Sequence, residues 1–175
     1  AAVMDPRYAV VNPAANAALV EGMKGLFNPT STISRQFKNG MMGEGILGLN
    51  EVSMSQSIKQ LTTGSRSATA GAVKTTVSSQ GASSIVLKSY SASVTIKAGE
   101  VFTVADCYSV NPQTRESTGS LQQFVVTADA TADGSGDVTV SVSPAIYTSS
   151  QALATVDSFP TADKTVTFLG SASTQ

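Results

Sequence analysis

The chain has 175 residues, with 11 Lys or Arg and 12 Asp or Glu, and the resulting net charge of −1 disfavours binding to nucleic acid, which requires a surplus of cations. A chain of this length can bury one hydrophobic core or two small ones. It has no histidine and a single cysteine, Cys107, which excludes a Ser-His-Asp or Cys-His relay, a disulfide within the chain and a cysteine-rich zinc site.

The N-terminal residues do not form a basic stretch followed by an apolar core, and the chain contains no run of 18 apolar residues. The sequence therefore predicts no signal peptide and no membrane-spanning helix, and we expect synthesis in the cytoplasm. It begins at Ala1 within AAVMDPRYAVV, which has no initiator Met and is typical of the middle of a domain. We therefore expect an internal fragment of a longer protein.

The first 60 residues predict a compact strand, helix, helix, strand unit. Residues 8–11 form a short apolar strand, and Asn12 and Pro13 are residue types that favour the start of a helix. A second, shorter helix is predicted over 31–38, and alternation predicts a half-buried strand over 51–58. We expect the first helix to end near Asn28-Pro29 and to pack on a core through one face, formed by Ala15, Leu19, Met23, Leu26 and Phe27.

From Gly64 onward the composition changes to Ser, Thr, Val and Ala with few charges, which predicts a domain boundary near residues 61–67. Such a composition is also found in flexible linkers, but the repeated alternation of β-branched residues favours a packed domain. Val138, Val140 and Val142 alternate with Thr and Ser, so one face of that strand should be buried. Turns are predicted at residues 97–100, 111–112, 117–119 and 133–137, and strands at residues 73–77, 84–88, 94–96, 101–105, 122–128, 137–142 and 164–169.

Several short strands at this spacing predict a small sandwich or barrel. The fold class expected for the whole chain is therefore α+β, with a small α/β piece followed by an all-β, antiparallel domain.

Residues 43–48, GEGILG, match the dinucleotide-binding pattern GxGxxG. No strand precedes the pattern, a strand instead of a helix is predicted to follow it, and residues 62–75 contain no acidic group to bind a ribose. We interpret these residues as a flexible loop.

Residues 129–140 resemble a calcium-binding loop, because they have oxygen-bearing side chains at alternate positions and Gly134 at the turn. The twelfth position is Val140 instead of the bidentate Glu that such a loop needs. We expect a solvated hairpin turn, with no metal and no cofactor.

Two acidic residues, Glu100 and Asp106, could approach each other across strands, and paired carboxyl groups can hydrolyse glycosides. We expect both to be solubilising surface charges, since nothing in the sequence indicates the pocket that would perturb them. Cys107 lies in a strand-like stretch and is expected to be a small buried hydrophobe. We predict no catalytic residue and no enzymatic activity.

Three ordered stretches carry a family resemblance: RYAVVNPAANAALVEGMKGLF, then GILGLNEVSMSQSI, then YSVNPQTRESTGSLQQFVVTADATADGSGDVTVSVSPAIY. Together they resemble the major coat proteins of short-tailed double-stranded-DNA bacteriophages that carry an inserted β domain. The resemblance covers residues 7 to about 172, and the switch from body to insertion falls where the composition changes. It implies a capsid body of the Hong Kong ninety-seven type for residues 1–63 and a β-barrel insertion domain for residues 64–172.

The resemblance also implies a function: a structural subunit that assembles into the icosahedral shell around phage DNA, with other coat subunits, a scaffolding protein and a portal protein as partners. The location implied is the virion, after synthesis in the cytoplasm of the bacterial host. Compared with that family, we expect these 175 residues to be a piece without the N-terminal arm, the long spine helix and the returning body segment. Six charges are expected in loops that are available for contacts between subunits: Arg66, Arg115, Glu116, Asp129, Asp133 and Asp137.

The main alternative is a β-sandwich module of a virion surface that binds a carbohydrate or a receptor. Aromatic platforms would favour it, but the chain has no Trp and only four Tyr. An enzyme is the third possibility, and it would depend on the two acidic residues 100 and 106.

Overall fold

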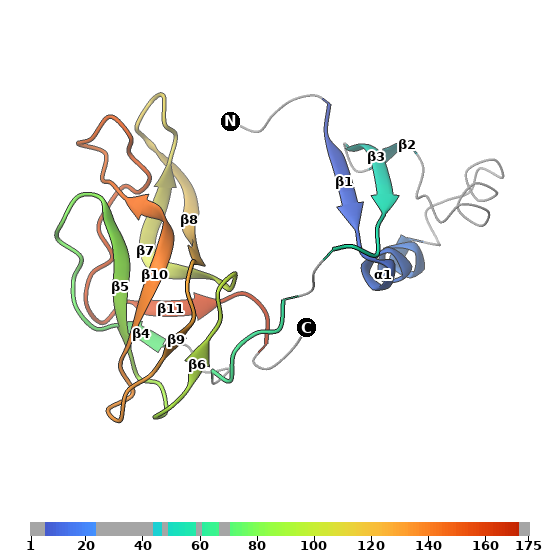
Figure 1. Cartoon of the computed structure of the whole chain (residues 1–175). Coiled ribbons are helices and arrows are strands. Elements are labelled where there is room, and N and C mark those ends of the chain that lie inside the picture. The colour runs from blue at the N-terminus through green and yellow to red at the C-terminus, as the bar shows by residue number, and fades with distance from the viewer. Residues whose placement is uncertain (1–5, 24–43, 47–48, 59–60, 67–70, 172–175) are drawn as a thin grey trace. The chain divides into compact units, whose positions relative to one another are not determined.

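The computed structural model describes residues 6–23, 44–46, 49–58, 61–66 and 71–171. They belong to two compact units, Ala1–Gln60 and Leu61–Gln175 (Figure 1). Strands make up most of the described structure, which contains one helix, α1 (Pro13–Met23). No helix among the described residues is long and apolar enough to cross a membrane.

The first unit contains a three-stranded sheet in the order β1-β3-β2. Strand β1 (Tyr8–Val11) runs parallel to β3 (Leu49–Met54), and β2 (Glu44–Ile46) pairs with β3 in the antiparallel direction. Between β1 and β3, α1 begins as predicted, since the Oδ1 atom of Asn12 accepts a hydrogen bond of 2.6 Å from the N–H of Ala15.

The helix does not bury the predicted face. Ala15 and Leu19 are exposed, and Asn16 is buried instead. Apolar residues, four of them alanines, lie on every side of this helix, so they do not mark one face in the sequence. The rest of the predicted helix, residues 24–27, and the second predicted helix, residues 31–38, lie outside the described residues.

One strand prediction and one loop prediction in this unit are wrong in part. The strand predicted over 51–58 ends at Met54, and Met54 and Ile58 are exposed while Val52 is buried. The hydroxyl of Ser55 accepts the N–H of Ser57, and this local turn stops the strand although the alternation continues. Residues 44–46 form β2 where a flexible loop was expected, because their backbone pairs with β3.

Six antiparallel strands of the second unit close into a barrel in the order β10-β5-β4-β11-β7-β8, and the short strands β6 and β9 form a separate pair. This closure agrees with the predicted sandwich or barrel. The barrel strands are β4 (Gly71–Val73), β5 (Ala82–Lys88), β7 (Val101–Val110), β8 (Ser117–Val126), β10 (Val138–Ile146) and β11 (Thr165–Phe168), and the short pair is β6 (Thr95–Ile96) and β9 (Ala130–Thr131).

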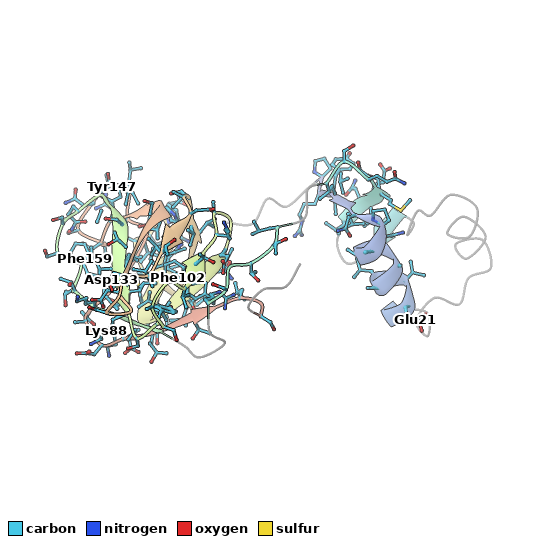
Figure 2. The ribbon with its side chains drawn as sticks, turned by 60° about the horizontal axis from the view of Figure 1, so that its bottom comes forward. Glu21, Lys88, Phe102, Asp133, Tyr147 and Phe159 are labelled. Carbon is cyan, nitrogen blue, oxygen red and sulfur yellow. The ribbon has the colours of Figure 1, made fainter. Side chains whose placement is uncertain are left out.

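Alternate side chains of the strands fill the barrel. The predicted alternation of Val138, Val140 and Val142 is confirmed, since all three are buried. Phe102 lies in the interior of this unit (Figure 2), with its ring centroid 5.7 Å from that of Phe124 and 5.1 Å from that of Phe168. Aromatic rings at these separations interact favourably beyond the area they bury.

Strands β7 and β8 are longer than predicted. In β7 the pairing register shifts around Asp106, which has a φ of 61°, so the alternation breaks there while the strand continues to Val110. Strand β8 begins at Ser117, where a turn was predicted, because the chain reverses at residues 111–116. In that reversal, Asn111 Oδ1 accepts the N–H of Gln113.

We predict that Ile85→Val lowers the free energy of unfolding by about 0.5–1.5 kcal/mol, because it removes a methylene from a side chain that is 1% exposed. Val125→Ala is the control. It removes more atoms, but from a side chain that is 38% exposed, and should change the free energy by about 0.5 kcal/mol or less. Urea unfolding of both variants tests the position of the core, and equal losses would contradict it.

Candidate functional site

A buried ion pair lies where the chain enters and leaves the barrel unit. Arg66 Nε donates a hydrogen bond of 2.5 Å to Glu100 Oε2, and the two side chains are only 3% and 0% exposed. Two expectations are therefore wrong: Arg66 is not an available loop charge, and Glu100 is not a surface charge. The two residues lie 34 positions apart, and no sequence pattern indicates that they meet.

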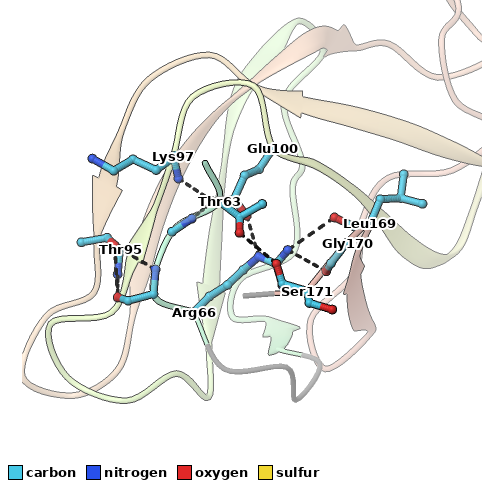
Figure 3. A network of polar contacts seen from close by, with 10 residues as sticks. Thr63, Arg66, Thr95, Lys97, Glu100, Leu169, Gly170 and Ser171 are labelled. Carbon is cyan, nitrogen blue, oxygen red and sulfur yellow. Dashed lines mark hydrogen bonds and ion pairs between the residues drawn. The ribbon is translucent and has the colours of Figure 1, made fainter. Parts of the chain in front are cut away.

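The carboxylate of Glu100 accepts two more hydrogen bonds. The backbone N–H groups of Gly64 and Lys97 each lie 2.7 Å from its Oε1 atom (Figure 3). A buried carboxylate is tolerated only when it is paired and hydrogen-bonded. Both oxygens of Glu100 meet this condition.

The guanidinium of Arg66 contacts the end of the barrel. Its Nη2 atom donates to the carbonyl oxygens of Gly170 at 3.0 Å and Leu169 at 3.4 Å. Its Cζ atom lies 4.5 Å from the ring centroid of Phe168, a cation–π distance. The same side chain thus connects Glu100, the outgoing chain and the aromatic core.

Two further contacts join the incoming segment, residues 61–66, to its neighbours. Thr63 Oγ1 donates a hydrogen bond of 2.8 Å to the carbonyl oxygen of Ser171, in the outgoing segment, residues 169–171. Ser65 and Thr95 exchange bonds of 3.1 Å between backbone N–H groups and hydroxyl oxygens. We call the two segments the neck and these polar contacts the neck network (Figure 3).

Three of the predicted loop charges are bonded within the chain. Asp129 contacts Lys97 Nζ at 2.7 Å and accepts the N–H of Ala98 at 2.8 Å, and the first of these contacts is the main reason that its pKa is lowered. Asp137 forms an ion pair with Lys74. Asp133 accepts the N–H groups of residues 135 and 137, so its carboxylate caps the turn. The described residues contain no group of three or more acidic, Cys or His side chains that could hold a metal ion.

The acidic pair considered for catalysis does not form. Asp106 Oδ2 pairs with Lys164 Nζ at 2.6 Å on the surface, and Glu100 is buried in the neck network. Cys107 is fully buried, as predicted, and burial raises the pKa of its thiol to about 12. A thiol in this environment is a poor nucleophile at neutral pH.

Arg115 and Glu116 are different from the other charges. They lie side by side and exposed in the reversal between β7 and β8, which we call the tip, residues 111–116. Every other charged side chain of residues 61–171 forms an ion pair or hydrogen bond within the described structure, and these two form none. Strand β7 runs ten residues from Val101, next to Glu100, to the tip, a length of about 30 Å.

A groove of about 220 Å³ lies between β5 and the segment that follows β4, and its lining carries no charge. Small-molecule pockets usually measure about 300–1,000 Å³. The groove is smaller than that range, and it is lined by Thr75, Thr76, Val77, Ser78, Ser79, Ala82, Ser84 and Val86.

We predict that the carboxyl group of Asp133 titrates below its ordinary pKa of 3.8, chiefly because the N–H of Asp137 and then that of Ser135 stabilise its charged form. A lowered pKa in the folded state adds stability above the unfolded pKa, and this part is lost as the pH falls through the folded value. Carboxyl ¹³C NMR gives the pKa directly. Asp133→Asn should remove this part of the acid sensitivity, and a normal pKa would contradict the capped turn.

The comparisons with known proteins give a likeness to solved structures and nothing else. No family model matches the chain, and no curated protein matches it either. A solved structure described as "CUS-3 coat protein I-domain" is similar over 59% of this chain and 96% of its own length, with 23% identity and a TM-score of 0.42. A likeness at this level does not establish a family.

Proposed function

We propose that the chain is part of a bacteriophage major coat protein, a structural and non-catalytic subunit of the icosahedral shell, in which the barrel unit is an inserted domain. The observation that carries the proposal is the closed neck. An inserted domain must leave and rejoin its carrier at neighbouring points, and here Thr63 Oγ1 lies 2.8 Å from the carbonyl oxygen of Ser171. The sequence resemblance predicts an insertion at the same place.

The first unit fits a piece of a larger body. Among its described residues Val52 is the buried hydrophobic side chain, whereas five large apolar side chains are exposed to solvent. A unit that buries so few apolar side chains among its described residues is what the proposal expects of a piece whose core is completed by the rest of the body. The exposed side chains are Tyr8 (64%), Val10 (56%), Met54 (44%), Leu19 (38%) and Ile58 (37%).

On this proposal the tip is the part of the barrel that contacts a neighbouring coat subunit. Among the described residues of 61–171, Arg115 and Glu116 are the charged side chains that form no ion pair or hydrogen bond, and β7 holds them about 30 Å from the neck. Shells assemble through many weak contacts between copies, so one charged contact per subunit affects assembly repeatedly. Scaffolding and portal proteins are further partners on this proposal, and the virion is the location.

We expect Arg115→Glu or Glu116→Arg, each placed alone in the full-length coat protein, to lower the yield of shells, because each places like charges together at the contact. Sedimentation through sucrose, with the soluble yield as control, measures the shells. Asp163→Lys reverses an exposed charge that pairs with Lys88 within the chain. It is the matched control and should lower the yield of shells less. Wild-type yields from both tip variants would remove the tip from the assembly contacts.

The alternative, a carbohydrate-binding surface module, has its best support in the uncharged, hydroxyl-lined groove. The proposal expects no binding of the 175-residue chain to a glycan array. Binding that Thr76→Val and Ser84→Ala abolish would favour the module instead.

A further inference from the structure

The neck network holds segments of the chain that are not held by strand pairing. The incoming segment forms no strand in the described structure, and its backbone is attached through side chains. Gly64 donates its N–H to Glu100, and Ser65 donates its N–H to the hydroxyl of Thr95. The backbone N–H groups of this segment are therefore bound by two side chains, those of Thr95 and Glu100.

The outgoing segment depends on the same network. Strand β11 ends at Phe168, and one backbone bond follows, from Leu169 N–H to the carbonyl oxygen of Val101 at 2.9 Å. Beyond it, the chain turns at Gly170, with a φ of 83°. The Gly170 and Ser171 carbonyl oxygens are then bound by Arg66 and Thr63.

The wall of the barrel does not use these contacts. Its six strands pair with one another, and none of the pairs includes residues of the neck. A buried ion pair is weak evidence for stability, since apolar residues of similar volume often stabilise a protein as well. Its geometry, with both charges hydrogen-bonded to the neck, instead fixes where the two segments lie.

We propose that Arg66 and Glu100 form a latch that holds the two ends of the barrel unit together and opens without opening the barrel wall. The role of the latch rests on the proposed function, because only in an inserted domain would it fix the direction in which the barrel leaves its carrier. The device itself is a property of the 175-residue chain and is tested on that chain.

The test measures the separation of the ends. Cysteines replace the exposed Thr62 and Ser171 and carry spin labels. Double electron–electron resonance then gives the distribution of distances between the two labels. The native Cys107 stays unlabelled, because it is buried and its pKa is about 12. The latch variant is Arg66→Met with Glu100→Leu, which leaves no buried charge without a partner. The matched control, Lys88→Met with Asp163→Asn, removes a pair of the same charges on the barrel surface.

We expect a narrow distribution in the parent and the control, and a broader, longer one in the latch variant, with the barrel still folded by near-ultraviolet circular dichroism. A narrow distribution in the latch variant would overturn the proposal. Loss of the barrel fold in the latch variant would also overturn the proposal if hydrogen exchange on the unmodified chain shows equal protection of the neck and the wall.

Hydrogen exchange on the unmodified chain needs no variant. The amides of Gly64 and Lys97, which bind Glu100, should exchange about tenfold or more faster than those of Val104 and Val140 in the wall, because the latch opens locally. Equal protection would mean that the neck opens only when the barrel unfolds, and would overturn the latch. Neither measurement depends on shell formation, so failure of the proposed function would leave both results interpretable.

Discussion

Glu100→Leu is expected to lower the free energy of unfolding of the barrel unit by about 3–5 kcal/mol. The change leaves the guanidinium of Arg66 buried without its counter-ion, and it removes the acceptor of the Gly64 and Lys97 N–H groups. Arg66→Met should cost less, since the carboxylate then keeps both N–H donors. Urea unfolding followed by circular dichroism measures the three free energies of a double-mutant cycle.

The double variant shows whether the two side chains are energetically coupled. Arg66→Met with Glu100→Leu should be more stable than Glu100→Leu alone, because no buried charge remains and the released neck exposes its N–H groups to water. Costs that simply add would show that the two side chains act independently, contrary to the 2.5 Å contact.

Gly136→Ala is expected to lower the free energy of unfolding by roughly 2–5 kcal/mol, from the strain of a left-handed residue and from overpacking. Gly136 has a φ of 80°, and a Cβ atom added there would lie 2.0 Å from the carbonyl oxygen of Tyr90. Thermal unfolding of the chain measures the loss.

Gly134 provides the control in the same turn. A Cβ atom added there meets nothing within 4 Å, so Gly134→Ala should change the free energy by about 0.5 kcal/mol or less. Similar losses for the two variants would show that the close approach of residue 136 to Tyr90 is wrong.

The parts of the fold that sequence predicts are those set by neighbouring residues. The alternation of Val138, Val140 and Val142 indicates a half-buried strand because the period of a strand is local. Asn12 and Pro13 likewise mark the start of the helix, since Asn12 binds a residue only three positions away in the sequence. The true extent of β7 was missed because the irregularity at Asp106 interrupts the alternation on which the prediction depends.

The candidate site was predicted less well, for a different reason. Charged residues in a Ser- and Thr-rich context are usually solvated, and nothing near Arg66 or Glu100 in the sequence shows that barrel closure brings them together. Long-range pairing of this kind depends on the order of the strands, which local patterns do not determine. Arg115 and Glu116 remain candidates for a contact between subunits because their position at a tip depends only on the hairpin around them.

The most direct test of the coat-protein assignment is negative-stain electron microscopy of the full-length gene product that contains this chain, with intact mass spectrometry of both proteins. We expect the gene product to be longer than 175 residues and to form shell-like particles of uniform size. A gene product that ends at Gln175 and stays monomeric would contradict the account and favour the binding module.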